Sequence, residues 1–156
     1  EALDKVSSGM TSLESLDQDL REDKVMILTA VKASQGRALQ HADLDARDDI
    51  EIVLEAVRRN GLALRHASAR LRDEQEVVSI AVQECGLSLE HASHTLRHDR
   101  TVALAAVRQN ARAIDFVGVS LLEDASFAIK IMQANPEVRR HLPVDIALGN
   151  ANNSQG

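Results

Sequence analysis

Hydrophobic positions along the chain recur at two spacings, a short one typical of helices and a long one of 25 residues. The short spacing is clear after Gly61, where Leu64, Ala67 and Leu71 stand three and seven positions apart and so share one helical face. The apolar run 77–82 that follows has apolar residues on more than one face, as expected for a helix packed between neighbours. The pattern therefore predicts a helix B over 62–71, about ten residues long, followed by a helix A from about 77 to 84.

The long spacing repeats this unit along the chain. The markers that each unit shares, a glycine and a His-Ala pair, stand at Gly36 and His41, Gly61 and His66, and Gly86 and His91. A fixed period of this length predicts an all-α fold in which short helix pairs stack into an α-solenoid-like array, right- or left-handed. The regular repeats run from about residue 20 to about residue 115.

Recurring residues mark where helix A starts and ends. Acidic residues that can accept the free N–H groups of a new helix stand at equivalent places, namely Asp49, Glu74, Asp99 and Asp124. The helix is expected to end at Asn60-Gly61 and Cys85-Gly86 through a residue with positive φ, whereas Ala111 weakens this stop in the fourth unit. The first unit holds one extra residue between Val31 and Gly36, which we place in the turn.

Residues 1–148 are predicted to form a single helical-repeat domain, followed by a polar tail at 149–156. Residues 1–20 form a degenerate opening repeat, and residues 115–148 a divergent last repeat with a cap that includes a short helix at 137–142 after Pro136. Such atypical ends cap the core of a repeat array. The face of the opening repeat is made by Leu13, Leu16 and Leu20.

The unit at 47–68 reads Arg-Asp-Asp-Ile-Glu-Ile-Val-Leu-Glu-Ala-Val-Arg-Arg-Asn-Gly-Leu-Ala-Leu-Arg-His-Ala-Ser. It resembles the repeats of a family known as domain of unknown function four-one-one-six, from about residue 20 to residue 115. The resemblance implies the fold and the register of the repeats and supplies no activity. Members of that family in intracellular bacteria and in unicellular algae imply two different settings, so an intracellular reducing compartment fits and an organelle such as a plastid is the alternative.

Composition narrows the classes of partner. The net charge of −6, the two phenylalanines Phe116 and Phe127 and the lack of Trp and Tyr argue against nucleic acid, which needs clustered cations and stacking side chains. Cys85 is the single cysteine, so no disulfide forms within the chain. No apolar run approaches the ~20 residues of a membrane span, so no membrane insertion is expected. Glu1 is compatible with a processed chain or an excerpt.

Two ladders of polar residues recur with the repeat. Stacked helices lie ~8–10 Å apart, too far for His41, His66 and His91 to share one metal ion by register, so we expect each ring to hydrogen-bond a loop carbonyl or the adjacent unit, with a ladder that faces a partner as the alternative. A second ladder has an acidic residue within two positions of each arginine, which favours salt bridges between units over an anion-binding strip. Its members are Arg21, Arg47, Arg72 and Arg97.

His91, His94 and His98 are the candidate metal ligands, because positions i, i+3 and i+7 share a helix face. No carboxylate or thiolate completes a known ligand spacing, and Arg97-His98-Asp99 falls at the predicted helix break. We therefore predict a solvated face here, with no metal and no cofactor. Cys85 lacks a positioned base near it in the sequence, so we expect no catalytic residue.

Positions that vary between units mark the predicted partner surface. Gln40, Arg65, Glu90 and Asp115 precede the histidine slot, and Asp43, Ser68, Ser93 and Gly118 follow it by two. The predicted contact residues are Gln40, Arg65, Glu90, Asp115, Phe116, Val117, Val119, Asn150, Asn152 and Asn153. A constant core under a variable face favours a non-catalytic protein-interaction module, an accessory or structural subunit of a larger assembly with an unidentified protein partner. The alternatives are a host-directed recognition domain of a bacterial effector and a metal-dependent binder or enzyme built on the histidine cluster.

Overall fold

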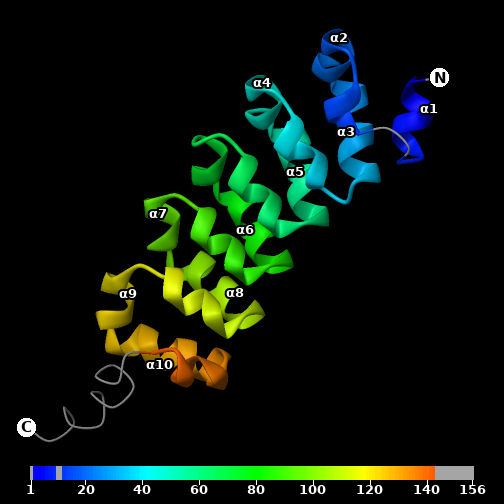
Figure 1. The fold of residues 1–156 in the computed structure, drawn as a ribbon. Helices are drawn as coiled ribbons and strands as arrows, with labels where there is room; N and C mark the ends of the chain where they lie inside the picture. The colour runs from blue at the N-terminus through cyan, green and yellow to red at the C-terminus, as the bar shows by residue number, and fades with distance from the viewer. Residues whose placement is uncertain (1, 10–11, 143–156) are drawn as a thin grey trace, which may run out of the picture.

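The chain folds into a stack of similar helical units. The computed structural model describes residues 2–9 and 12–142, and Figure 1 shows the units following one another diagonally from the N-terminal to the C-terminal side. Each unit contributes a short helix, a longer α-helix and a 3-10 helix, in that order. Long helices pack on the long helices of adjacent units, and 3-10 helices do the same. The predicted all-α repeat array is confirmed.

The long helices are all ten residues long: α3 (Lys24–Ala33), α5 (Ile50–Arg59), α6 (Gln75–Glu84), α8 (Arg100–Gln109) and α10 (Ala125–Ala134). The 3-10 helices that follow them are η2 (Arg37–His41), η3 (Gly61–His66), η5 (Gly86–His91), η6 (Ala111–Phe116) and η7 (Pro136–Arg140). The short helices that precede them are α2 (Gln18–Glu22), α4 (Leu44–Arg47), η4 (Leu71–Asp73), α7 (His94–Arg97) and α9 (Val119–Glu123). At the start of the chain, α1 (Ala2–Ser7) packs against α3, and η1 (Leu13–Ser15) packs against η2.

The predicted helix B is wrong as one continuous helix. It divides into η3 and η4, because Ala67 is extended (φ −67°, ψ 155°) and ends the first of them. Leu64, Ala67 and Leu71 are nevertheless all buried, as their spacing predicted. A 3-10 turn followed by an extended residue keeps the same side chains inward as a helix would, so the hydrophobic pattern alone does not distinguish the two.

Four long helices begin at an aspartate, as the acidic start signals predicted. Asp49 accepts the N–H groups of Glu51 and Ile52 at 2.9 and 3.2 Å. The other capping carboxylates are those of Asp23, Asp99 and Asp124. Glu74 stands at the same place before α6, and its side chain caps no N–H group. Its extra methylene moves the carboxylate past the first turn.

We expect Glu74→Asp to raise the free energy of unfolding by about 1 kcal/mol, because it supplies the cap that the other units have. Asp99→Glu is the matched reverse change, since Asp99 caps Thr101 and Val102, and it should lower the value by a similar amount. Urea denaturation followed by far-ultraviolet circular dichroism measures both. An unchanged midpoint for both variants would show that these caps add nothing to the stability of the stack.

Positive φ does not end the long helices at Gly61 or Gly86, contrary to the prediction. Among glycines of the described residues, only Gly9 and Gly36 have positive φ. The extra residue of the first unit does lie in the turn, where Gln35 (φ 54°) and Gly36 (φ 82°) are both left-handed. In three of the other units the side chain of an asparagine such as Asn60 accepts the N–H of the residue two positions on, at 3.1 Å from Leu62, whereas Cys85 makes no such bond in the unit of α6.

Gly61 and Gly86 are instead required by the close approach of successive units. A Cβ built on Gly61 would overlap the carbonyl oxygen of Ala81 in α6 and lie 2.9 Å from Ser88 Oγ. A Cβ on Gly86 would overlap the carbonyl oxygen of Ala106 in α8 in the same way. Glycine therefore allows the start of each 3-10 helix to touch the backbone of the next long helix.

The buried side chains of the long helices are small and repeat in register. In α5 they are Ile52, Val53, Ala56 and Val57, and α6 and α8 bury the equivalent positions. We call the contact between two successive units a joint. At the first three joints, the alanine of this set faces the glycine of the preceding unit. At the last joint the equivalent residues are Ala111 and Ile131, both larger, so this joint cannot close as tightly as the others.

Ser88 is the polar residue of this core, in the place that Ala38, Ala63 and Ala113 take in other units. Its hydroxyl is buried and has no hydrogen-bond partner among the described residues. We expect Ser88→Ala to raise the free energy of unfolding by about 1 kcal/mol, because a buried hydroxyl without a partner is destabilising. Ser93→Ala should lower it, since that hydroxyl donates to Asp73 and accepts the N–H of Leu96. Equal effects of the two changes in urea denaturation would contradict the distinction.

Candidate functional site

Successive units are joined by backbone hydrogen bonds at the arginines of the second ladder. The carbonyl oxygens of Arg47, Arg72 and Arg97 accept the N–H groups of residues 68, 93 and 118 in the following unit, at 2.8 to 2.9 Å. At two joints a side-chain pair reinforces this bond, with Ser68 donating to Asp48 and Ser93 donating to Asp73. The Ser68 hydroxyl, and after it the Arg70 guanidinium, hold the pKa of Asp48 below its usual range.

This joint corrects one part of the predicted partner surface. The position two residues after each histidine is not a free surface, because Ser68 and Ser93 bind the preceding unit through their side chains. The residue at this position changes together with the residue that faces it in the preceding unit. In the first joint the equivalent positions hold Glu22 and Asp43, two acids that line one hollow.

The last joint has a different pair, His98 and Gly118. A Cβ on Gly118 would overlap the imidazole ring of His98, so the ring takes the space that a serine side chain has elsewhere. The ring is held there from two sides. Its Nδ1 lies 2.7 Å from the carbonyl oxygen of His94, and its centroid lies 4.1 Å from the His94 ring.

The structure separates the three candidate metal ligands. His91 ends η5, Ala92 is extended, and His94 begins α7, so the predicted shared helix face does not exist and that expectation was wrong. Only His94 and His98 come together, as stacked rings. Within residues 2–9 and 12–142, no three His, Cys, Asp or Glu side chains gather closely enough to hold a metal ion.

Among the described residues, the arginine ladder forms none of the predicted salt bridges. Arg47 donates from Nε to the carbonyl of Ala42 (3.0 Å) and from a terminal nitrogen to that of Gln40 (2.8 Å), so it caps the carboxyl end of η2. The buried Nε atoms of the other three ladder arginines have no partner in the described structure. Ion pairs between units use other residues, such as Lys24 with Asp49 at 2.8 Å and Arg70 with Asp48 at 3.1 Å.

The predicted contact residues Gln40, Arg65, Glu90 and Asp115 do form one row. They occupy equivalent, exposed positions on η2, η3, η5 and η6, which pack side by side. We call these four residues the 3-10 row. Two of the histidines bind the row, and neither binds the loop carbonyl that was one of the two predicted partners: Arg65 Nε donates to His66 Nε2 at 2.8 Å, and Gln40 Nε2 lies 2.8 Å from His41 Nε2. His41 also reaches the preceding unit, with Nδ1 3.5 Å from Glu14.

His66 lies among positive groups. Burial lowers its pKa, and Arg65, Arg47, His91 and His41 lower it further by repulsion. His91 differs, because burial and two arginines lower its pKa while the neighbouring Glu90 raises it. The groups that act on His66 are therefore all of positive sign, whereas His91 has an acidic neighbour.

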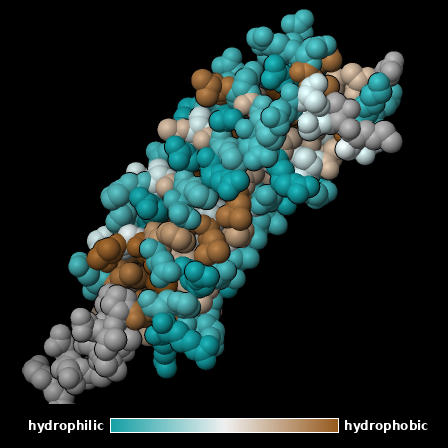
Figure 2. All heavy atoms as spheres, viewed as in Figure 1, coloured by the Kyte–Doolittle hydropathy of each residue, from teal (hydrophilic) through white to brown (hydrophobic). Residues whose placement is uncertain are grey.

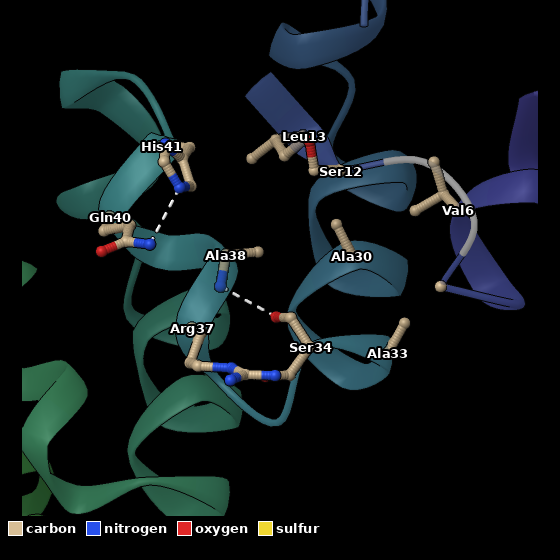
Figure 3. A pocket seen from close by; sticks show the side chains of 11 residues that line it. Val6, Ser12, Leu13, Ala30, Ala33, Ser34, Arg37, Ala38, Gln40 and His41 are labelled. Atoms are coloured by element: carbon tan, nitrogen blue, oxygen red, sulfur yellow. Dashed lines mark hydrogen bonds between the residues drawn. The ribbon is translucent and has the colours of Figure 1, made fainter. Parts of the chain in front are cut away.

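Two hollows flank η2. The first, about 170 Å³, lies between η2 and η3 and includes Arg37, Gln40, Arg65 and His66; we call it the basic hollow. The second, about 350 Å³, lies between η2, α3 and the N-terminal elements. Figure 3 shows its lining, with Val6 and Leu13 on one side, and Arg37 reaching from η2 toward Ser34, whose carbonyl accepts its Nε at 3.1 Å. Arg37 and Gln40 line both hollows.

Opposite charge lines a third hollow, about 330 Å³, next to α2 and α4. Its carboxylates are those of Glu22, Asp43, Asp45 and Asp49, and its one cation is Lys24. Lys24 binds Asp49 and Glu51, and these bonds raise its pKa. The basic hollow and this third hollow therefore carry opposite charges, although the whole chain is acidic.

The repeats of this chain match a known family model. The model is described as Domain of unknown function (DUF4116), and it matches three overlapping segments, residues 27–72, 49–97 and 74–122. Together these segments span more than half of the chain. The chain belongs to the DUF4116 family. Each match takes in almost two of the units described above, which confirms the resemblance seen in the sequence.

No curated protein and no solved structure matches this DUF4116 chain significantly. Of the helices in the described part of the chain, none is both long and apolar enough to cross a lipid bilayer.

The last predicted contact residues lie at the C-terminal end of the DUF4116 array. Val117 is 5% exposed, in the slot of the buried Ala42, Ala67 and Ala92, so it has to be withdrawn from the predicted surface. Phe116 is half-buried, whereas Val119 is 66% exposed. Figure 2 shows hydrophobic surface gathered around α9, the helix that Val119 begins. Asn150, Asn152 and Asn153 lie outside the described residues.

Sequence reasoning missed Arg37 as a site residue. It stands one position after Gly36, in a slot that holds Leu62, Leu87, Arg112 and Glu137 in the other units. That slot varies as much as the 3-10 row does, so the same comparison of equivalent positions finds it.

Proposed function

We propose that this DUF4116 chain is a non-catalytic protein-interaction module that serves as an accessory or structural subunit of a larger assembly. The observation that carries the proposal is the contrast within the 3-10 helices. Their inward positions are small or aliphatic in every unit, whereas the exposed 3-10 row changes from Gln40 to Arg65, Glu90 and Asp115. A constant scaffold with variable exposed charge supports recognition of an extended partner.

The exposure of the row supports the same proposal. Each of its side chains is exposed, and the basic hollow opens between two of its members, Gln40 and Arg65. Backbone bonds join the second unit to the third and each later unit to the next, which keeps Arg65, Glu90 and Asp115 in a fixed register without a partner. Preorganised surfaces of this kind bind with little loss of conformational entropy.

The test is site-specific photo-crosslinking in the native cells. The photoreactive residue benzoylphenylalanine replaces Arg65 or Glu90 in the row, and, as matched controls, Glu76 or Thr101, which are exposed on the long helices α6 and α8. We expect one discrete cross-linked protein from both row positions and none from the control positions. The same products from both sets, or none from the row, would contradict the proposal.

A further inference from the structure

We propose that the basic hollow between η2 and η3 binds an acidic segment of a protein partner, with its carboxylates facing Arg37, Arg65 and His66. The inference rests on the proposed function, because it names the kind of partner that the 3-10 row takes. Three observations lead to it: the charge of the hollow, the surroundings of His66 and the shape of the surface beside it.

The hollow concentrates positive charge in an acidic chain. The protein has 24 Asp and Glu against 18 Lys and Arg, yet no acidic residue is among those that line this hollow. Arg65 donates to His66, and Arg37 donates to the carbonyl of Ser34. Neither guanidinium takes part in an ion pair between described residues. Their charge is therefore left for a ligand of opposite sign to balance.

Groups that are positive or can be protonated act on His66 from its own helix and from three others. These groups are Arg65 on η3 itself, Arg47 on α4, His41 on η2 and His91 on η5. A carboxylate bound beside the ring would replace this repulsion with attraction. Binding would then favour the protonated imidazole, whose Nε2 no longer accepts from Arg65 Nε and so releases this guanidinium to the ligand, and proton uptake accompanies binding.

The shape of the surface fits an extended segment. The basic hollow, about 170 Å³, is too small for a folded element and large enough for one or two side chains. The second hollow lies on the other side of η2 and has apolar lining at Val6, Leu13 and Ala38 (Figure 3). A segment that crosses η2 would place acidic side chains in the first hollow and an aliphatic side chain toward the second.

The experiment uses the full chain and an oligoglutamate peptide of about eight residues, labelled with a rhodamine dye and followed by fluorescence anisotropy at low salt. Arg37→Glu with Arg65→Glu reverses both guanidinium charges of the hollow. Arg58→Glu with Arg108→Glu makes the same change in net charge at exposed positions on α5 and α8. We expect the hollow variant to weaken binding at least about tenfold and the control variant to change it less than about twofold.

Protonation gives a second readout. The free protein holds the pKa of His66 below its usual value of 6.5, and a bound carboxylate raises it. Affinity for oligoglutamate should therefore rise as the pH falls from about 7.5 to about 6, where glutamate, with a pKa near 4.3, remains ionised. His66→Gln should remove most of this rise while circular dichroism shows an unchanged fold.

Three results would overturn the inference. Equal weakening by the hollow and control variants would show attraction to net charge alone. Undetectable binding of oligoglutamate by the wild-type chain would show that the hollow does not recognise carboxylates. Tighter binding of single-stranded oligothymidylate at the same residues would assign the hollow to nucleic acid instead.

The inference and the proposed function fail separately. If the photo-cross-linked partner forms with the Arg37→Glu, Arg65→Glu chain as efficiently as with wild type, the interaction role stands and the acidic-segment inference fails. If no partner cross-links to the 3-10 row while oligoglutamate still distinguishes the two variants, the chemistry of the hollow stands and the proposed function fails.

Discussion

Replacing Gly61 by alanine is expected to lower the free energy of unfolding by about 3 kcal/mol, a large effect for the addition of one methyl group. The added Cβ would overlap the carbonyl oxygen of Ala81, which belongs to the backbone of α6 and cannot rotate away. Two units would have to separate, and their separation loosens every contact along the joint. Since the chain has no Trp or Tyr, far-ultraviolet circular dichroism in urea is the suitable measurement.

Other glycines of the chain allow the cost of a close contact to be measured separately from the cost of a left-handed backbone conformation. Gly9 has a positive φ (73°) and no described atom within 4 Å of an added Cβ, so Gly9→Ala measures conformational strain alone, about 1 kcal/mol. Gly61 has no positive φ, so Gly61→Ala measures the contact alone. Gly36 has both features, and Gly36→Ala should combine the two costs. A loss at Gly61 no larger than that at Gly9 would refute the close-approach explanation.

The last joint should show strong coupling between His98 and Gly118. Gly118→Ser alone is expected to lower the free energy of unfolding by about 2 kcal/mol, because the side chain displaces the His98 ring from its bond with the His94 carbonyl. His98→Asp alone should cost about 1 kcal/mol, since it removes that ring and leaves space at the joint. Together the two changes recreate the pair found at Ser68 and Asp48.

The double variant should therefore be about as stable as wild type, with a coupling free energy of about 3 kcal/mol from the double-mutant cycle. The cycle is measured by the same urea denaturation. His94→Ala serves as the control, because it removes the stacked ring and keeps its backbone carbonyl as the acceptor for His98. Additive effects of Gly118→Ser and His98→Asp would show that the two residues do not share one space.

The fold could be predicted where a residue acts on its own neighbours in the sequence. The carboxylate of Asp49 caps the helix that begins beside it, and the extra residue before Gly36 lies in the turn where the count placed it. The break at Ala67 could not be predicted, because a helix and a 3-10 turn followed by an extended residue bury the same leucines. The reason for Gly61 was also hidden, since the atom that excludes a side chain belongs to Ala81 in the next unit.

The candidate site could be predicted only where the repeat itself identifies equivalent positions. Equivalent positions in the repeats identified Gln40, Arg65, Glu90 and Asp115 as one row, and the row exists. Ser68 was assigned to that surface wrongly, because its partner Asp48 stands 20 positions earlier and only the stacking of units joins them. The basic hollow depends on Arg37 and His66, which are brought together by the packing of η2 on η3.

The joint between Arg47 and Ser68 recurs almost unchanged between later units, and in the described residues each unit touches mainly its immediate neighbours. A structure of this kind is a linear polymer rather than a closed globule, because no contact between distant units sets its length. Whole units of 25 residues can then be gained or lost in evolution without redesign of the remainder, provided that each new joint has the glycine and the arginine carbonyl bond of the second and third joints. The reach of the 3-10 row, and with it the length of partner that the row accommodates, would change in the same steps.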